Sequence, residues 1–211
     1  MLRITEIFHS LQGETSRVGL PTVFIRLTGC PLRCGYCDTS YAFSGGKLMS
    51  IDHVMDQVTQ FLPHYVTVTG GEPLAQAECQ FLLTVLCDYG YSVSLETSGA
   101  LDISQVDQRV SRIVDIKTPG SGEVDKNRWE NLHYLTMQDE LKFVLCDEND
   151  YQWARQVVLD RNLDKICPIL FSPVFHQLDP ATLAAWILRD KLSVRLQLQL
   201  HKLIWGDCPG K

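Results

Sequence analysis

The sequence of 211 residues contains no apolar run of 18 or more residues, so we expect no membrane-spanning helix and no membrane partner. It also lacks the continuous apolar segment of a secretory signal near its N-terminus, which favours a cytoplasmic protein. Basic residues are few: 19 Lys and Arg stand against 25 Asp and Glu. A nucleic-acid-binding surface needs a basic patch, so we expect no nucleic-acid partner. Repeats and low-complexity linkers are absent, and the length suits a single domain over 1–211.

The group of cysteines near the N-terminus has no fourth member. Cys30, Cys34 and Cys37 follow the spacing Cys-x-x-x-Cys-x-x-Cys, and the next cysteine is Cys79. Three thiolates are one short of a closed tetrahedral zinc site or a fully ligated iron–sulfur cluster. Spacing alone leaves three interpretations open: a cluster with one open iron, a zinc site completed by a distant histidine, or buried apolar side chains. We expect the other five cysteines to be structural thiols, not disulfides.

Short β-branched runs alternate with helical patterns along most of the chain. Six runs are typical of buried strands, at 22–29, 65–70, 92–98, 112–117, 140–145 and 165–171. Strict alternation of polar and apolar residues over 195–201 predicts a further strand with one polar face. Helical spacing predicts helices over 51–62, 75–89 and 149–162, and a fourth from Pro180, with Ser50 and Asp179 as N-caps. Only weak helix signals occur over 103–134.

The alternation of strands and helices predicts an α/β fold with a parallel sheet and right-handed crossovers. Six or seven strands are too few for a closed eight-stranded barrel, so we expect an incomplete, TIM-like barrel. Its site would lie at the C-terminal ends of the strands. Cys30 directly follows one predicted strand and Gly70-Gly71-Glu72-Pro73 ends another, which places both on that rim. Paired glycines there allow the backbone to approach a ligand closely.

Together, the cysteine motif and Gly70-Gly71-Glu72-Pro73 resemble the radical S-adenosylmethionine (SAM) superfamily. The resemblance implies that the three cysteines hold a 4Fe–4S cluster whose open iron chelates SAM. Four further motifs resemble the 7-carboxy-7-deazaguanine synthase family: Leu11-Gln12-Gly13-Glu14, Phe24-Ile25-Arg26, Cys37-Asp38-Thr39 and Gln199-Leu200-His201-Lys202. Enzymes of that family are lyases that convert 6-carboxy-5,6,7,8-tetrahydropterin to 7-carboxy-7-deazaguanine with release of ammonia, on the route to queuosine.

This second resemblance implies a set of site residues. The pterin contacts would be Leu11, Gln12, Gly13, Arg26 and Thr69. The SAM contacts would be Tyr36, Cys37, Asp38, Gly71, Asp115, Ile116, Lys117, Ser172, Pro173, Val174 and Phe175. The Thr39 hydroxyl would hold a Mg²⁺ that also binds the substrate carboxylate, and water can supply the remaining ligands of such an ion. The resemblance further implies a homodimer and a flavodoxin or ferredoxin as electron donor.

The implied reaction begins with reductive cleavage of SAM to a 5′-deoxyadenosyl radical, which takes a hydrogen from C6 of the pterin. The Mg²⁺ would polarise the substrate and steer the ring contraction. Arg26 offers a planar fork that suits a carboxylate, although an ordinary ion pair at the rim explains it equally well. Four side chains could move protons or only form hydrogen bonds at the rim: Glu14, Glu72, Glu96 and His201.

Two other functions remain open at this point. A glycyl-radical-enzyme activase shares the cysteine spacing and the short chain but acts on a protein, whereas the 11–14 motif and Arg26 favour a small carboxylated substrate. A zinc-stabilised interaction domain would need a fourth metal ligand. It also gives no reason for paired glycines on the same rim as the cysteines.

Overall fold

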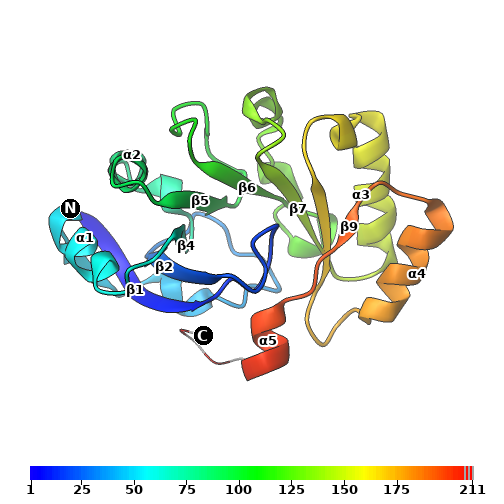
Figure 1. Cartoon of the computed structure of the whole chain (residues 1–211). Coiled ribbons are helices and arrows are strands. Elements are labelled where there is room, and N and C mark those ends of the chain that lie inside the picture. The colour runs from blue at the N-terminus through cyan, green and yellow to red at the C-terminus, as the bar shows by residue number, and fades with distance from the viewer. Residues whose placement is uncertain (207, 209, 211) are drawn as a thin grey trace.

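In the computed structural model, which describes residues 1–206, 208 and 210, the chain is organised around one nine-stranded sheet with the order β3-β1-β2-β4-β5-β6-β7-β8-β9 (Figure 1). The strands are β1 (Leu2–Leu11), β2 (Pro21–Leu27), β3 (Lys47–Met49), β4 (Tyr65–Gly70), β5 (Ser92–Thr97), β6 (Ser111–Ile116), β7 (Glu140–Leu145), β8 (Ile169–Pro173) and β9 (Arg195–Leu196). All neighbours from β2 to β9 are parallel, and β1 pairs antiparallel with β2 and β3. Within the described residues β3 and β9 remain edges, so the predicted incomplete barrel is confirmed.

The helices occupy the predicted crossovers. They are α1 (Ile51–Thr59), α2 (Cys79–Asp88), α3 (Glu148–Asp160), α4 (Pro180–Asp190) and α5 (Leu200–Trp205). Ser50 caps α1 by accepting a hydrogen bond from the His53 amide, and Asp179 caps α4 by accepting from the Ala181 and Thr182 amides. Both caps match the sequence prediction. Besides strand β6, the region 103–134 with weak helix signals contains short 3₁₀ turns and no α-helix: η3 (Pro119–Ser121), η4 (Val124–Lys126) and η5 (Trp129–Tyr134).

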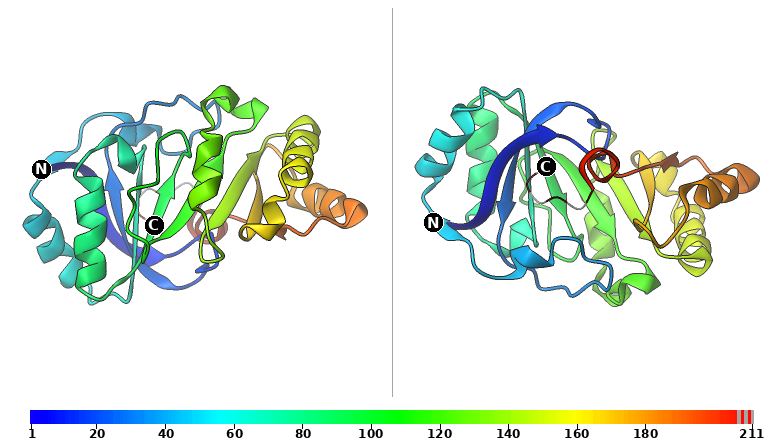
Figure 2. Two further views of the ribbon diagram at one scale, coloured as in Figure 1. Left: turned by 90° about the horizontal axis from the view of Figure 1, so that it is seen from above. Right: turned by 90° about the horizontal axis from the view of Figure 1, so that it is seen from below.

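The helices are not distributed evenly around the sheet. Figures 1 and 2 show α1 and α2 beside the β1–β5 side and α3 and α4 beside the β7–β9 side, whereas α5 lies apart from both pairs. None of the described helices has the length and apolar character that a membrane crossing requires. No disulfide forms in the described chain, and Cys79, Cys146 and Cys167 are buried thiols, as expected.

Three sequence predictions were wrong in their bounds. The strand expected over 195–201 is limited to β9, because Leu200 starts α5 and donates its amide to the Gly13 carbonyl at 2.9 Å. The strand expected from 165 starts at Ile169, after a 3₁₀ turn over Leu163–Lys165. The helix expected from 75 starts at Cys79, because Pro73–Ala75 forms its own 3₁₀ turn. The strands β1 and β3 were not predicted at all.

The loop between β1 and β2, residues 12–20, fills the amino end of the half-barrel. Arg17 donates to the carbonyl and hydroxyl of Ser92 at 3.0 Å each, and its guanidinium lies 5.2 Å from the centre of the Tyr65 ring. The Ser16 amide donates to Glu140 Oε1 at 2.8 Å. Since Tyr65, Ser92 and Glu140 are the first residues of β4, β5 and β7, this loop joins the starts of three strands.

Candidate functional site

A cavity of about 550 Å³ lies at the C-terminal ends of the strands, where the sequence placed the site. Its volume is in the range of small-molecule sites. The predicted site residues that line it are Leu11, Gln12, Gly13, Arg26, Cys30, Cys34, Tyr36, Cys37, Asp38, Thr39, Thr69, Gly71, Asp115, Lys117, Val174 and Phe175. Three predicted SAM contacts, Ile116, Ser172 and Pro173, are buried within strands and do not line the cavity.

The cysteine loop and the glycine loop are joined backbone to backbone. The Gly71 amide donates to the Leu27 carbonyl at 3.1 Å, and the Glu72 amide donates to the Gly29 carbonyl at 2.8 Å. A Cβ at Gly71 would overlap the Gly29 carbonyl and lie 2.9 Å from the Cys30 Cβ. Only glycine therefore permits this approach, which sets the first cysteine against the glycine loop.

The three cysteines of the loop present their thiols to this cavity, and each is only partly buried. Burial raises the pKa of Cys30 and Cys34, while the nearby Lys117 ammonium acts in the opposite direction. Among the described residues no three Cys, His, Asp or Glu side chains converge as they would around a single ion. Three thiols facing one shared space, without a fourth protein ligand among them, fit a 4Fe–4S cluster with one open iron.

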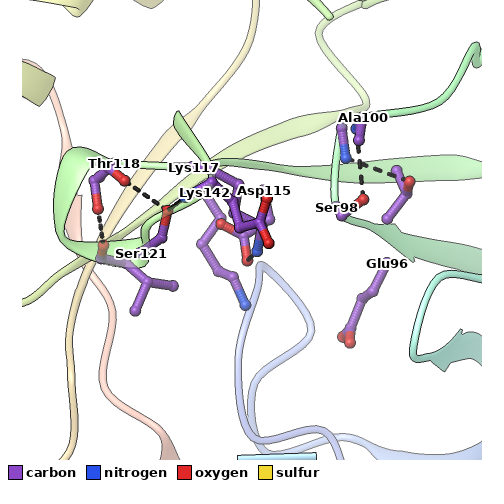
Figure 3. A network of polar contacts seen from close by, with 12 residues as sticks. Glu96, Ser98, Ala100, Asp115, Lys117, Thr118, Ser121 and Lys142 are labelled. Carbon is purple, nitrogen blue, oxygen red and sulfur yellow. Dashed lines mark hydrogen bonds and ion pairs between the residues drawn. The ribbon is translucent and has the colours of Figure 1, made fainter. Parts of the chain in front are cut away.

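One side of the cavity carries buried polar atoms without partners. Asp115, at the end of β6, pairs with Lys117 at 2.9 Å through Oδ2 (Figure 3). Its Oδ1 and the hydroxyl of Tyr36 are buried and form no hydrogen bond with the described residues. Burial, and then the Asp115 carboxylate, raise the pKa of Tyr36, so the phenol keeps its proton and remains a donor. An unused donor and an unused acceptor on one cavity wall are suited to a polar ligand.

Away from the cysteine loop, the β1–β2 loop forms the cavity floor. Glu96 accepts hydrogen bonds from the Thr69 hydroxyl at 2.9 Å and from Gln12 Nε2 at 3.3 Å. Gly13 lies against His201 of α5, and a Cβ at this position would overlap the imidazole ring. The contact brings α5 over the floor, so the motifs at 11–14 and 199–202 meet at one place although the sequence separates them.

Several charged side chains around the cavity are held in ion pairs with other described residues. These pairs include Glu6–Arg26 at 2.7 Å, Glu14–Lys142 at 2.8 Å, Asp115–Lys117 at 2.9 Å and Asp38–Lys202 at 3.1 Å. Glu96 differs, because its hydrogen-bond partners among the described residues, Gln12 and Thr69, are neutral side chains. Burial raises the pKa of Glu96, so this carboxyl holds a proton at a higher pH than an exposed glutamate does.

Lys142 was missed by the sequence analysis. It lies in the middle of β7 (Figure 3), and its side chain is 15% exposed. Lys142 lines the cavity and pairs there with Glu14 at 2.8 Å. Burial opposes its charge, but the carboxylates of Glu14, Asp115 and Glu96 raise the pKa of Lys142 well above its usual value. A single lysine inside the otherwise apolar run Leu141–Leu145 was the available signal, since a buried strand rarely tolerates an unpaired ammonium.

The other candidates for proton transfer differ in whether they line the cavity. Glu72 does not line the cavity; it is fully buried and accepts hydrogen bonds from the Thr97 hydroxyl and the Ser98 amide. Its role is the structural one. Glu14 and His201 do line the cavity, and burial lowers the pKa of His201, which leaves its imidazole neutral near pH 7.

The end of the cysteine loop connects to α5. The Thr39 hydroxyl donates to Asp38 Oδ1 at 2.9 Å, which leaves the Thr39 oxygen free to accept or to bind a cation. Burial alone would raise the pKa of Asp38, but the Lys202 ammonium and the Thr39 hydroxyl lower it to about 2. The ion pair between Asp38 and Lys202 therefore persists at any physiological pH.

Comparison with known proteins gives consistent results. The model of the radical SAM superfamily matches residues 24–117. A 7-carboxy-7-deazaguanine synthase from Chlorobaculum tepidum is 47% identical over 97% of this chain and 94% of its own length, and one from Koribacter versatilis is 45% identical over 97% of each. The crystal structure of QueE from Escherichia coli superposes with a TM-score of 0.77 at 23% identity, covering 95% of this chain and 94% of that one. At that identity the superposition supports the fold alone.

Proposed function

The chain belongs to the 7-carboxy-7-deazaguanine synthase family, within the radical SAM superfamily, and we propose that the cavity at the strand ends is its active site. It is a lyase that converts 6-carboxy-5,6,7,8-tetrahydropterin to 7-carboxy-7-deazaguanine and ammonia. The atoms of the substrate equal those of the two products, so the conversion needs no net oxidant. We propose further that residues 1–211 act as one radical SAM domain.

We assign cluster binding to Cys30, Cys34 and Cys37, whose thiols share one wall of the cavity. When bound, the cluster and SAM together supply the radical that abstracts a substrate hydrogen. Gly71 provides bare backbone beside Cys30, and the unpartnered Tyr36 hydroxyl and Asp115 Oδ1 offer a donor and an acceptor to SAM. These residues hold and orient the cofactor, and the surrounding buried side chains exclude water.

The pterin would lie on the floor made by Leu11, Gln12 and Gly13, with Thr69 and Arg26 around it. Arg26 presents a guanidinium to the substrate carboxylate, and we assign Mg²⁺ binding to Thr39, which lines the same cavity. Release of ammonia requires proton movement. Glu96, which retains a proton more readily than an exposed glutamate, and the neutral His201 imidazole are the groups placed to supply and accept protons there.

One observation carries this proposal: three thiols, the paired glycines and Arg26 converge on a single cavity. The test uses anaerobically purified protein, which should bind about four irons per chain. With reductant, SAM, Mg²⁺ and the carboxypterin it should form a deazapurine, detected by absorbance and mass. A colourless protein with one zinc would contradict the radical chemistry, and an iron-loaded protein that activates a glycyl-radical enzyme instead would favour the activase.

The role of Thr39 has its own test. Thr39→Ala should raise the Mg²⁺ concentration needed for half-maximal turnover, because the ion loses its protein ligand. Thr59→Ala is the matched control, since its hydroxyl bonds only the Asp56 carbonyl at the end of α1. An unchanged Mg²⁺ titration for Thr39→Ala would remove this residue as the ligand.

We further propose a cytoplasmic homodimer that receives electrons from a flavodoxin or ferredoxin. Family membership supports both expectations. Light scattering of the purified protein measures the dimer directly, and reduction of the cluster by each donor, followed by its absorbance, identifies the electron source.

A further inference from the structure

Strand β1 contains an irregularity that the activity so far leaves unexplained. Ile4 pairs with Leu27 of β2, but the next pair is Glu6 with Arg26, so Thr5 is an extra residue on β1. Cross-strand partners point to the same face of a sheet, and neighbours along a strand point to opposite faces. Without the bulge, Glu6 would pair with the fully buried Ile25 and face the core. With it, Glu6 faces the same side as Arg26.

The bulge places Glu6 in a cage around the Arg26 guanidinium. Arg26 Nε donates to Glu6 Oε1 at 2.7 Å, and the Tyr41 hydroxyl donates to the same oxygen at 2.8 Å. The rings of Phe8 and Tyr41 lie 5.7 and 5.8 Å from the guanidinium carbon. The Arg26 and Glu6 side chains are only 15% and 24% exposed, so this pair is more constrained than an ordinary surface ion pair.

The geometry also decides which nitrogens remain for a ligand. Arg26 lines the cavity, whereas Glu6 does not. Within the described residues, Arg26 forms side-chain hydrogen bonds through Nε alone. The two terminal nitrogens, Nη1 and Nη2, are thus the donors left to the cavity. A carboxylate bound by this pair receives two parallel hydrogen bonds.

We propose that Glu6 is a positioning residue that selects for the carboxylate of the substrate: it holds Arg26 by Nε and so keeps the Nη1–Nη2 edge turned into the cavity. This inference rests on the proposed function, in which Arg26 contacts the pterin. Tyr41 extends the effect, because its hydroxyl fixes the same Glu6 oxygen and its ring covers the guanidinium.

The test uses the cluster-loaded enzyme with SAM, and compares turnover with binding of two fluorescent ligands, 6-carboxypterin and pterin without the carboxylate. Glu6→Ala should raise KM about tenfold or more with kcat within about threefold, since an interaction made equally in ground and transition states is lost. Binding of 6-carboxypterin should weaken in parallel and binding of pterin should not. Glu6→Gln retains an acceptor for Nε and should restore most of the affinity, and Tyr41→Phe should give a smaller loss than Glu6→Ala.

A double substitution shows whether Glu6 acts through Arg26. Arg26→Ala should weaken 6-carboxypterin binding at least as much as Glu6→Ala, and the pair together should be no worse than Arg26→Ala alone. Glu148→Ala, in a loose exposed pair with Arg189, is the control and should change nothing.

The role of Glu6 would be overturned if the losses of affinity in Glu6→Ala and Arg26→Ala added up in the double variant. It would also be overturned if Glu6→Ala weakened binding of 6-carboxypterin and of pterin equally. An Arg26→Ala enzyme with unchanged affinity for 6-carboxypterin would overturn it too, by removing the contact it depends on. A wild-type holoenzyme that binds 6-carboxypterin without turning the substrate over would instead contradict the proposed function, and the binding comparison would still decide the role of Glu6.

Discussion

The two ends of the half-barrel both contain buried ion pairs, but they differ in how completely the paired side chains are hydrogen-bonded. At the amino end, Arg112 and Asp139 are 5% and 0% exposed and bind each other through two side-chain hydrogen bonds of 3.0 and 2.8 Å. Asp139 also accepts from the Arg112 amide and from both the amide and hydroxyl of Thr136. At the carboxyl end, Asp115 pairs with Lys117 but keeps Oδ1 without a partner.

The fully bonded pair at the amino end can stabilise the fold, whereas the carboxylate at the carboxyl end retains an oxygen that can bind a ligand. Among the described residues, the buried side-chain nitrogen and oxygen atoms near the starts of the strands have hydrogen-bond partners, except Glu140 Oε2. Where the strands end, donors and acceptors remain unused on a cavity wall. The β1–β2 loop spans both regions, since Arg17 ties it to Ser92 at the amino end and Glu14 meets Lys142 at the cavity.

The largest effect should come from the carboxyl end. Cys34→Ser should abolish turnover and lower bound iron, because the cluster loses one of its three ligands. Thermal unfolding of the iron-free protein should change little, since this thiol is half-buried and forms no disulfide. Cys87→Ser, at a half-buried thiol on α2, is the matched control and should keep both iron and turnover. Substantial turnover by Cys34→Ser would contradict the cluster assignment.

The next largest effect should come from the amino end. Arg112→Met should lower the free energy of unfolding by about 3–5 kcal/mol, because Asp139 is left charged and buried. KM should remain unchanged in the folded fraction. Arg109→Met removes the ion pairs of an exposed guanidinium with Asp88 and Asp107 and should lower the free energy of unfolding far less. Denaturant titrations measure both, and equal costs would remove the distinction between buried and exposed pairs at this end.

Lys142 lies between these extremes, since it is buried but faces the cavity. Lys142→Met should cost about 2 kcal/mol, because Glu14 loses its cation while water in the cavity still reaches it. The Lys142 ammonium now keeps the pKa of Glu14 low, against the effect of burial. That stabilisation is complete above the unfolded pKa near 4.5 and disappears as the pH falls through the lower folded value.

In Lys142→Met the effect of burial on the Glu14 pKa is no longer opposed by this ammonium, so the loss of stability in acid that is linked to Glu14 should disappear. The cost of the substitution should therefore shrink as the pH falls from 7 to 3, which denaturant titrations over this range would detect. The double variant Glu14→Gln with Lys142→Met should recover most of the loss. A double variant with a lower free energy of unfolding than Lys142→Met would show that the two side chains do not act as a pair.

The smallest effect should come from Glu96. Burial raises the pKa of Glu96 in the folded protein above its pKa in the unfolded chain. Its contribution to stability is therefore complete at pH values below the unfolded pKa, and it is lost as the pH rises through the folded pKa. Glu96→Gln should therefore increase the free energy of unfolding at pH 8 by up to about 1 kcal/mol and should give no gain at pH 4, while turnover falls. A gain that is independent of pH would mean that packing, not charge, is responsible.

The parallel part of the fold could be predicted closely from the sequence. The strands β4 and β7 occupy the predicted residues 65–70 and 140–145, because a strand buried on both faces needs a continuous β-branched or apolar run. The strand β1 could not be found this way, since it pairs antiparallel and carries polar residues on both faces. The bulge at Thr5, which turns Glu6 toward Arg26, leaves no local signal.

The site was predictable where a motif defines it and not where tertiary contacts do. The cysteines form one short motif and the paired glycines another, and each follows a predicted strand. Their positions in the sequence were therefore enough to place both at the carboxyl ends of the strands. Lys142 is a single charge whose partner, Glu14, is 128 residues away. The pattern at 195–201 favoured a strand, but the contact of Leu200 with Gly13 makes α5 instead, because long-range packing overrides local alternation.

The position of α5 has a consequence for the order in which the parts of the site can assemble during folding. Lys202 reaches Asp38 of the cysteine loop and lies 5.4 Å from the Phe175 ring, and Leu200 binds Gly13. These three partners lie in segments remote from α5 in the sequence, so the wall that α5 contributes can be complete only when those segments are themselves folded. A chain whose α5 has not docked would leave this side of the cavity, and with it the approach to the three thiols, more open than in the folded protein.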